Sequence, residues 1–286
     1  MISRRAWITS MASQAWCASK GTPYVIGKGP ERATPSGARV PFGWGAAPVL
    51  EETRFAFNGA GLRFRITNAV DSREIRQLEA LTAKSRSRVG IFDMRYSYAL
   101  QPFELVLDSA VASKVSDEGV ILRQIAGRQP VWIFVDGAPA PLLPHLLGKT
   151  EGSSRDNFER RLRGLESLQP FGWMEGCVLD ALHALGDFEA LDSHLRMFLP
   201  DSRSLIYEDP KSIPADNRLL DIEGTLPFAA IAIRRPDHAS IDLAIRFWNA
   251  KRDAEDCVLS GGMTSAEGSY TVAWPMAVLG KARRDR

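Results

Sequence analysis

The stretch W-M-E-G-C-V-L-D-A-L-H-A-L, residues 173–185, carries the pattern that decides the predicted fold. In it, an acidic residue followed by glycine opens a run of apolar residues. The same opening recurs in VDGAPAPLLPHLL (135–147), IEGTLPFAAIAI (222–233) and AEGSYTVAWPMAVL (266–279). Successive acidic residues lie 39, 48 and 44 residues apart. Such a regular recurrence predicts a repeat architecture.

Two weaker copies extend the repeat toward the N-terminus. Asp93 stands in FDMRYSYAL (92–100) and Glu52 in VLEETRFAF (49–57), each without the following glycine. Amphipathic segments with apolar residues at helical spacing lie between the copies, at 71–84, 155–168, 187–199 and 237–248. We therefore expect each unit to hold an apolar helix and an amphipathic one. Strand patterns are limited to LRFRI (62–66) and VWIFV (131–135).

These units predict an all-α fold, an (α/α)6-type toroid of helical hairpins, possibly incomplete, with an open solenoid of the HEAT type as the alternative. A carboxylate at the start of a helix is favoured by the helix dipole. A closed ring would collect several such carboxylates around one pocket, which favours the toroid. We expect one helical toroid domain over residues 46–286, preceded by a leader and linker over 1–45.

Composition narrows the function. The chain has 286 residues, 45% hydrophobic and 24% charged, which is typical of a globular protein. Lys and Arg number 36 against 34 Asp and Glu, and no basic stripe is present, so no nucleic acid is expected as a partner. No apolar run is long enough to span a membrane. The three cysteines show no metal-site spacing, and we expect Cys177 and Cys257 to be buried thiols.

The N-terminal segment resembles an export signal. Ser3-Arg4-Arg5-Ala6-Trp7-Ile8 is similar to a twin-arginine motif, and a weakly apolar stretch follows it. If this signal is real, the protein is periplasmic or secreted, and otherwise it is cytoplasmic. Residues 19–45 are rich in Gly and Pro and are expected to form a linker.

Two of the repeat copies resemble a known family. FDMRYSYAL around Asp93 and VWIFVDGAPAPLLPHLL around Asp136 resemble segments of the unsaturated glucuronyl and rhamnogalacturonyl hydrolases, glycoside hydrolase families 88 and 105. In those families, aspartates in motifs of the form D-x-G-F and (I/L)-D-(G/T)-x-(M/Y)-x-x-P begin two inner helices of a toroid. The second motif matches better, since Pro141 follows Val135-Asp136-Gly137. The resemblance covers roughly residues 85–286.

The resemblance implies a hydrolase that acts on oligosaccharides containing unsaturated uronic acid. Such an enzyme protonates the C4=C5 double bond and adds water at C5, without metal, nucleotide or other cofactor. By this resemblance Asp136 is the proton donor and the base that activates water. Asp93 holds the substrate or raises the pKa of Asp136.

Other residues at the expected helix starts are candidates for substrate binding. They are Trp132, Trp173, Glu175, Arg218, Glu223, Glu267 and Tyr270. Aromatic rings at these positions form either a platform for sugar or part of the core. Arg218, like Arg95, either grips a uronate carboxylate through two hydrogen bonds or forms a surface ion pair.

Three alternatives remain open at this level. A sugar epimerase of the same fold should carry histidines at its helix starts, and this chain carries none there. A polysaccharide lyase needs a Tyr or His base, for which Tyr270 beside Glu267 is the candidate. A non-catalytic helical-repeat scaffold predicts that Asp93 and Asp136 do not share a cleft. The oligomeric state does not follow from any of these patterns.

Overall fold

The computed structural model describes residues 24–35, 40–148, 154–206, 223–253 and 268–284. These ranges hold ten strands in three antiparallel sheets and seven α-helices, so the protein is a mixed α/β protein and the prediction of an all-α toroid is wrong. The chain divides into two compact units, Met1–Asn157 and Phe158–Arg286. In the ranges described, no helix is long and apolar enough to cross a membrane.

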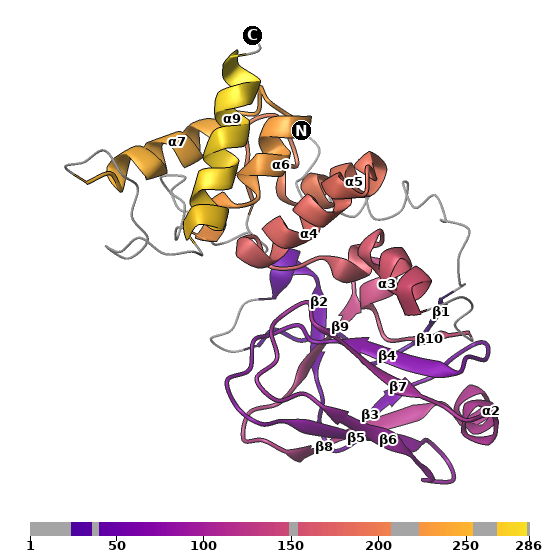
Figure 1. Ribbon diagram of the computed structural model, residues 1–286. Coiled ribbons are helices and arrows are strands. Elements are labelled where there is room, and N and C mark those ends of the chain that lie inside the picture. The colour runs from indigo at the N-terminus through magenta and orange to yellow at the C-terminus, as the bar shows by residue number, and fades with distance from the viewer. Residues whose placement is uncertain (1–23, 36–39, 149–153, 207–222, 254–267, 285–286) are drawn as a thin grey trace, which may run out of the picture. The chain divides into compact units, whose positions relative to one another are not determined.

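The first unit contains every strand found among the described residues (Figure 1). Its elements are β1 (Val25–Ile26), η1 (Pro41–Gly43), β2 (Gly45–Pro48), β3 (Thr53–Phe55), β4 (Arg63–Thr67), β5 (Gln77–Thr82), β6 (Arg88–Asp93), β7 (Pro102–Val106), α2 (Ser109–Glu118), β8 (Val120–Ala126), β9 (Trp132–Asp136), η2 (Ala140–Leu142) and β10 (His145–Leu147). The helix α3 (Ser154–Leu162) crosses the boundary between the units.

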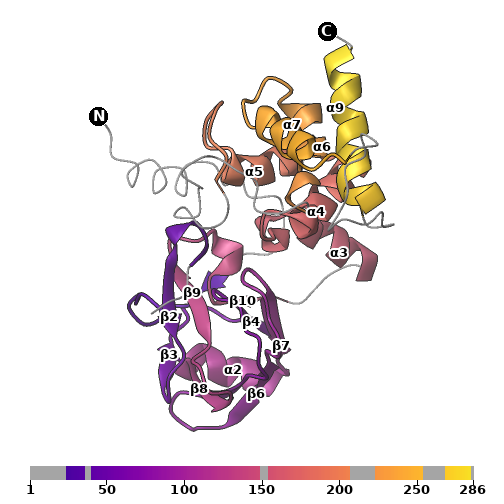
Figure 2. The ribbon, with the colours of Figure 1, turned by 90° about the vertical axis from the view of Figure 1, so that its left-hand side faces the viewer.

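Two four-stranded sheets enclose the core of this unit. Their strand orders are β1-β10-β4-β7 and β3-β8-β5-β6, and β2 pairs with β9 in a separate ribbon (Figure 2). Phe64 and Ile66 of β4 pack in one cluster with Leu78 of β5 and Leu122 of β8. The core therefore forms between the inner faces of the two sheets, as in a β-sandwich.

The segment 71–84 shows why the helical prediction failed in this unit. Leu78 and Leu81 are buried, but Ile75 is exposed, so the apolar stripe of the expected helix does not exist. Residues 77–82 instead form the central strand β5, which pairs with β6 and β8. Alternate residues Leu78, Ala80 and Thr82 are buried, as the two-residue period of a strand requires. The two strands predicted at 62–66 and 131–135 are confirmed as β4 and β9.

The second unit is helical. It contains η3 (Leu165–Ser167), α4 (Trp173–Ala184), α5 (Phe188–Phe198), η4 (Glu223–Thr225), α6 (Phe228–Arg234), α7 (Ile241–Ala250), a five-residue π-helix η5 (Ser269–Ala273) and α9 (Trp274–Arg284). The amphipathic helix predicted from Asp187 is confirmed as α5, and the Asp187 side chain accepts a hydrogen bond from the Ala190 amide at its N-terminus. Ser240, rather than Asp237, precedes α7.

The apolar helices of this unit pack on one another. α6 contacts α4 and α9, and η4 contacts η5, so the segments that lead into α6 and α9 meet. Gly176 of α4 allows the close approach at this point, because a Cβ there would lie 2.5 Å from the Leu226 side chain. Phe171 links the helices further through ring contacts with Phe198 and Phe228.

Candidate functional site

The two predicted catalytic aspartates lie in the first unit, and neither begins a helix. Asp93 is the last residue of β6 and Asp136 the last residue of β9, so the expectation of helix starts is wrong for both. Asp93 pairs in register with Gln77 in one sheet, and Asp136 with Gly45 in the β2–β9 ribbon. Both side chains are exposed.

Asp93 is held by its own neighbour. The Arg95 guanidinium donates to both carboxylate oxygens, at 2.9 Å from Nε and 2.5 Å from the terminal nitrogen. This hydrogen-bonded pair lowers the pKa of Asp93, so its carboxylate is ionised at neutral pH. Asp93 can therefore bind a donor, but it has no proton to give.

Asp136 lies over the backbone of the neighbouring strand. Its carboxylate occupies the space that a side chain at position 45 would need, which explains the glycine there. Gly137 follows with φ +68°, a left-handed conformation that suits glycine at the turn out of β9. Trp132, at the other end of β9, is half-buried and pairs with Pro48.

The remaining predicted site residues belong to the second unit. Glu223 begins η4. Arg218 and Glu267 lie outside the described residues. Glu175, Trp173 and Tyr270 can be placed in full, and they fall into two different environments.

Glu175 lies in the interior. It is fully buried, accepts a hydrogen bond from the Gln169 amide at 2.8 Å, and lies 2.8 Å from Nδ1 of the buried His194. Burial raises the pKa of Glu175. Ser167 is 3.4 Å from His194 Nε2, but its hydroxyl donates to the carbonyls of Leu162 and Gly164. This buried cluster joins η3, α4 and α5.

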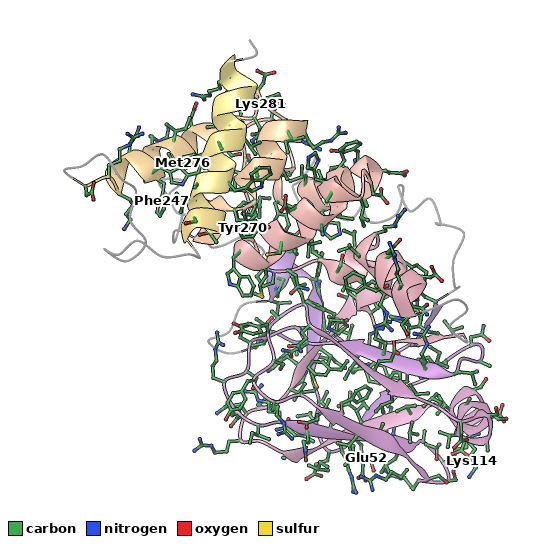
Figure 3. All side chains as sticks on the ribbon, in the orientation of Figure 1. Glu52, Lys114, Phe247, Tyr270, Met276 and Lys281 are labelled. Atoms are coloured by element: carbon green, nitrogen blue, oxygen red, sulfur yellow. The ribbon has the colours of Figure 1, made fainter. Side chains whose placement is uncertain are left out.

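Trp173 and Tyr270, by contrast, lie on the surface. Trp173, Cys177 and Asp180 follow one another at helical spacing along one face of α4, and the first two are exposed. The expectation that Cys177 is buried is therefore wrong; Cys257 lies outside the described residues. Figure 3 labels Tyr270, whose side chain lies at the η5 end of α9.

A hydrogen bond joins the two elements. The Tyr270 hydroxyl donates to Asp180 Oδ2 at 2.8 Å. Burial, followed by the bond to Asp180, raises the pKa of Tyr270 well above its ordinary value. Tyr270 consequently keeps its proton at neutral pH.

A shallow groove continues from this contact. It is too narrow to hold a water molecule, and its lining includes Asp180 and His183 of α4, Ala229 of α6 and Trp274 of α9. Trp173, Tyr270 and Trp274 expose 45%, 39% and 39% of their surfaces. We call the residues Trp173, Cys177, Asp180, Tyr270 and Trp274 the α4–η5 surface. It presents three partly exposed aromatic rings and one carboxylate.

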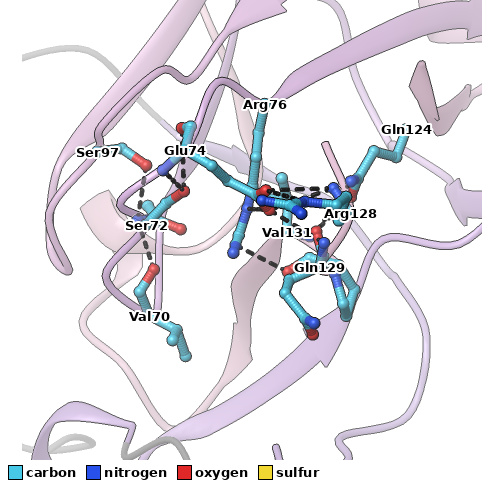
Figure 4. A network of polar contacts seen from close by, with 11 residues as sticks. Val70, Ser72, Glu74, Arg76, Ser97, Gln124, Arg128, Gln129 and Val131 are labelled. Atoms are coloured by element: carbon cyan, nitrogen blue, oxygen red, sulfur yellow. Dashed lines mark hydrogen bonds and ion pairs between the residues drawn. The ribbon is translucent and has the colours of Figure 1, made fainter. Parts of the chain in front are cut away.

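A polar network around Glu74 in the first unit serves the fold. In Figure 4, the Glu74 carboxylate accepts hydrogen bonds from the amides of Arg128 and Gln129 and from Arg76 Nε. Arg76 in turn donates to the Pro130 carbonyl at 2.9 Å. These bonds fasten the turn between β8 and β9 to the start of β5. They explain the lowered pKa of Glu74, whose largest cause is the Gln129 amide.

The comparisons with known proteins add no relative: no protein-family model, no curated protein and no solved structure matches this chain. The resemblance to the unsaturated uronyl hydrolases therefore stays a prediction. In the part of the chain that the structure describes, no group of three or more His, Cys, Asp or Glu residues is placed to hold a metal ion.

Sequence reasoning missed Asp180 and Cys177. The spacing of Trp173, Cys177 and Asp180 could have revealed them, because residues four and seven positions apart share a helix face. The partnership of Tyr270 with Asp180 has no local signal, since 90 residues separate the two.

Proposed function

We propose that the protein binds a carbohydrate on the α4–η5 surface. The observation that carries the proposal is the Tyr270–Asp180 hydrogen bond, which fixes a carboxylate among exposed aromatic rings. Flat aromatic faces pack against the C–H faces of sugar rings, and a carboxylate accepts hydrogen bonds from sugar hydroxyls. A few polar groups placed among aromatic side chains are typical of small-ligand sites.

The charge of this surface favours a neutral sugar. Asp180 is its acidic residue, and none of its five members is basic. A uronate carboxylate beside Asp180 would add like-charge repulsion, whereas the hydroxyls of a neutral sugar would donate to it. We therefore expect neutral oligosaccharides to bind more tightly than uronate oligosaccharides.

Tyr270 acts as a donor in this proposal. Because burial and the bond to Asp180 raise its pKa, Tyr270 loses its proton less readily than an ordinary tyrosine and is a poorer candidate for the base that a polysaccharide lyase needs. Its hydroxyl instead orients Asp180 toward the ligand. The lyase alternative is thereby disfavoured.

The test is a titration of the full chain with neutral and uronate oligosaccharides, in which binding is measured by tryptophan fluorescence and by calorimetry. We expect saturable binding of a neutral member, weakened about fivefold by Trp173→Ala, in line with the ~1 kcal/mol typical of an aromatic contact. The matched control for Tyr270→Phe is Tyr96→Phe, since Tyr96 is also exposed but lies in the first unit. Binding that is unchanged in Trp173→Ala, Asp180→Asn and Tyr270→Phe would refute the proposal.

Hydrolysis at an unsaturated uronic acid is a second, separate proposal, and its support is the sequence resemblance. Asp136 would supply the proton and activate water, and the ionised Asp93 would hold the substrate. This reaction would use the first unit and is separable from binding on the α4–η5 surface.

A further inference from the structure

The π-helix η5 has a local cause in the sequence. In a regular α-helix, the amide of residue 275 would donate to the carbonyl of residue 271. Residue 275 is proline, which has no N–H and whose ring crowds the carbonyl four residues before it. The π-helix Ser269–Ala273 ends directly before Trp274-Pro275, so the widened turn lies where that bond is lost.

A side chain from another element supplies a donor to the same carbonyl. The Thr225 hydroxyl donates to the Thr271 carbonyl oxygen at 2.7 Å, and both residues are buried. Thr225 is the last residue of η4, so the bond joins the segment before α6 to the segment before α9. Forty-six residues separate the two partners.

The widened turn decides where Tyr270 points. Within η5, Thr271 and Val272 are buried, while Tyr270 is exposed and reaches Asp180. A π-helical turn inserts an extra residue and rotates the side chains that precede it, and such turns are frequent at functional sites. A carbonyl held at Thr271 therefore sets the orientation of the adjacent Tyr270.

We propose that Thr225 is a positioning residue, whose hydroxyl holds the π-helical turn that presents Tyr270 to Asp180. This role deepens the proposed carbohydrate site, because it assigns the geometry of that site to a residue outside the α4–η5 surface. The contact itself can be measured without any ligand. The positioning role can therefore be tested even if the carbohydrate proposal fails.

The test compares Thr225→Val, which removes the donor, with Thr225→Ser, which keeps it. Nuclear magnetic resonance of [ζ-¹³C]tyrosine follows the Tyr270 phenol between pH 7 and 11, and Tyr270→Phe assigns the signal. In the natural protein we expect a Tyr270 signal that does not titrate over this range. We expect Thr225→Val to shift that signal and let it titrate within this range, and Thr225→Ser to restore the natural signal.

A second variant separates positioning from general destabilisation. Pro275→Ala returns a backbone N–H that can donate to Thr271, so Thr225→Val should have a smaller effect on the Tyr270 signal in that background. Circular dichroism verifies that each variant is folded. A Tyr270 signal that is unmoved and still does not titrate in folded Thr225→Val would overturn the proposal. So would an equal effect of Thr225→Val with and without Pro275.

In the binding titration, Thr225→Val should weaken the binding of a neutral oligosaccharide as much as Tyr270→Phe does, and Thr225→Ser should leave this binding unchanged. A shifted Tyr270 signal without carbohydrate binding by any variant would reject the proposed function and keep the positioning role. A Tyr270 signal that is unmoved in Thr225→Val, together with intact carbohydrate binding, would reject the positioning role and keep the proposed function.

Discussion

The hydroxyl of Tyr270 and the carboxylate of Asp180 are joined by a 2.8 Å hydrogen bond, although 90 residues separate them in the chain. The bond ties the face of α4 to the π-helix before α9. Because the Asp180 carboxylate accepts a hydrogen bond from the protonated phenol, the bond helps to raise the pKa of Tyr270. Asp180 is therefore both the polar centre of the α4–η5 surface and the partner that orients its tyrosine.

Asp180→Asn should lower the pKa of Tyr270. An amide oxygen is a weaker acceptor than a carboxylate, and the negative charge that disfavours the phenolate is removed. In [ζ-¹³C]tyrosine spectra, Tyr270 should then titrate at lower pH than in the natural protein. Asp242→Asn is a suitable control, because Asp242 is an exposed acceptor that bonds to Arg283 instead. An identical Tyr270 titration in Asp180→Asn would contradict the assigned hydrogen bond.

Glu175→Gln should gain stability relative to the natural protein as the pH rises. Burial raises the folded pKa of Glu175 above its unfolded value of 4.5, so the folded state holds its proton longer than the unfolded state. The natural chain therefore loses stability from this group as the pH rises above about 4.5. Glutamine keeps a donor and an acceptor for His194 and for the Gln169 amide but cannot ionise.

Urea unfolding of both proteins between pH 4 and 8 measures this difference. The two unfolding free energies should lie closest together at pH 4. A difference that stays constant over the range would mean that Glu175 ionises in the folded state as readily as in the unfolded one.

His145 should make the first unit sensitive to acid. It is fully buried on β10, and burial lowers its pKa from 6.5 to about 4. The folded state therefore binds fewer protons, and the stability contributed by the neutral imidazole is lost as the pH falls from 6.5 toward 4. The full loss for this shift is about 3 kcal/mol.

His145→Asn should remove that part of the acid sensitivity, because asparagine does not titrate. Its amide nitrogen can still donate to the Leu143 carbonyl, as His145 Nδ1 does at 2.6 Å. The measurement is the unfolding free energy of each protein at pH 7 and pH 4.5. Equal losses on acidification in the two proteins would show that His145 is not the titrating group.

Gly176→Ala should destabilise the helical unit, whereas Gly280→Ala should not. A Cβ at 176 would lie 2.5 Å from the Leu226 side chain, and forcing an extra methyl group into a packed interface costs about 1–3 kcal/mol. No heavy atom lies within 4 Å of a Cβ at 280, in the interior of α9, so alanine there should stabilise by about 0.5–1 kcal/mol. Thermal unfolding measures both effects. Leu226→Ala should relieve much of the cost of Gly176→Ala, and an undiminished cost would mean that the strain lies elsewhere.

The hydrolase proposal predicts loss of absorbance near 235 nm when the protein acts on unsaturated uronides. The panel contains pectin, rhamnogalacturonan and glycosaminoglycan fragments made by lyases. Asp136→Asn should abolish the decay, and Asp93→Asn should weaken it by loss of substrate binding. Decay that persists in both variants would remove these residues from the reaction, and no decay on any fragment would remove the reaction itself.

The sequence predicted the helical unit better than the strand unit, for a physical reason. In the second unit, helix α5 has a cap at Asp187 and an apolar stripe whose period of 3.6 is repeated over several turns. In the first unit, β5 is six residues long, and Leu78 and Leu81 fit a helical stripe as well as a strand. What makes it a strand is pairing with β6 and β8, which the local sequence does not contain.

The candidate site shows the same division. Trp173 and Tyr270 were predicted because aromatic residues beside acid–Gly steps are visible in the sequence. Asp180 was not, since its role depends on a tyrosine brought to it by the packing of α4, α6 and η5. The acidic residues at 93 and 136 fitted a short motif, yet strand pairing places them at the ends of β6 and β9.

The pairing of β1 with β10 has a consequence for synthesis on the ribosome. Val25 pairs with Leu146, so β1 cannot pair within its sheet until almost the whole unit has been synthesised. Contacts so distant along the chain slow folding, because the loop between them must close first. Until His145–Leu147 emerges, one edge of β4 is open to pairing with another nascent chain, which raises the risk of aggregation during this interval.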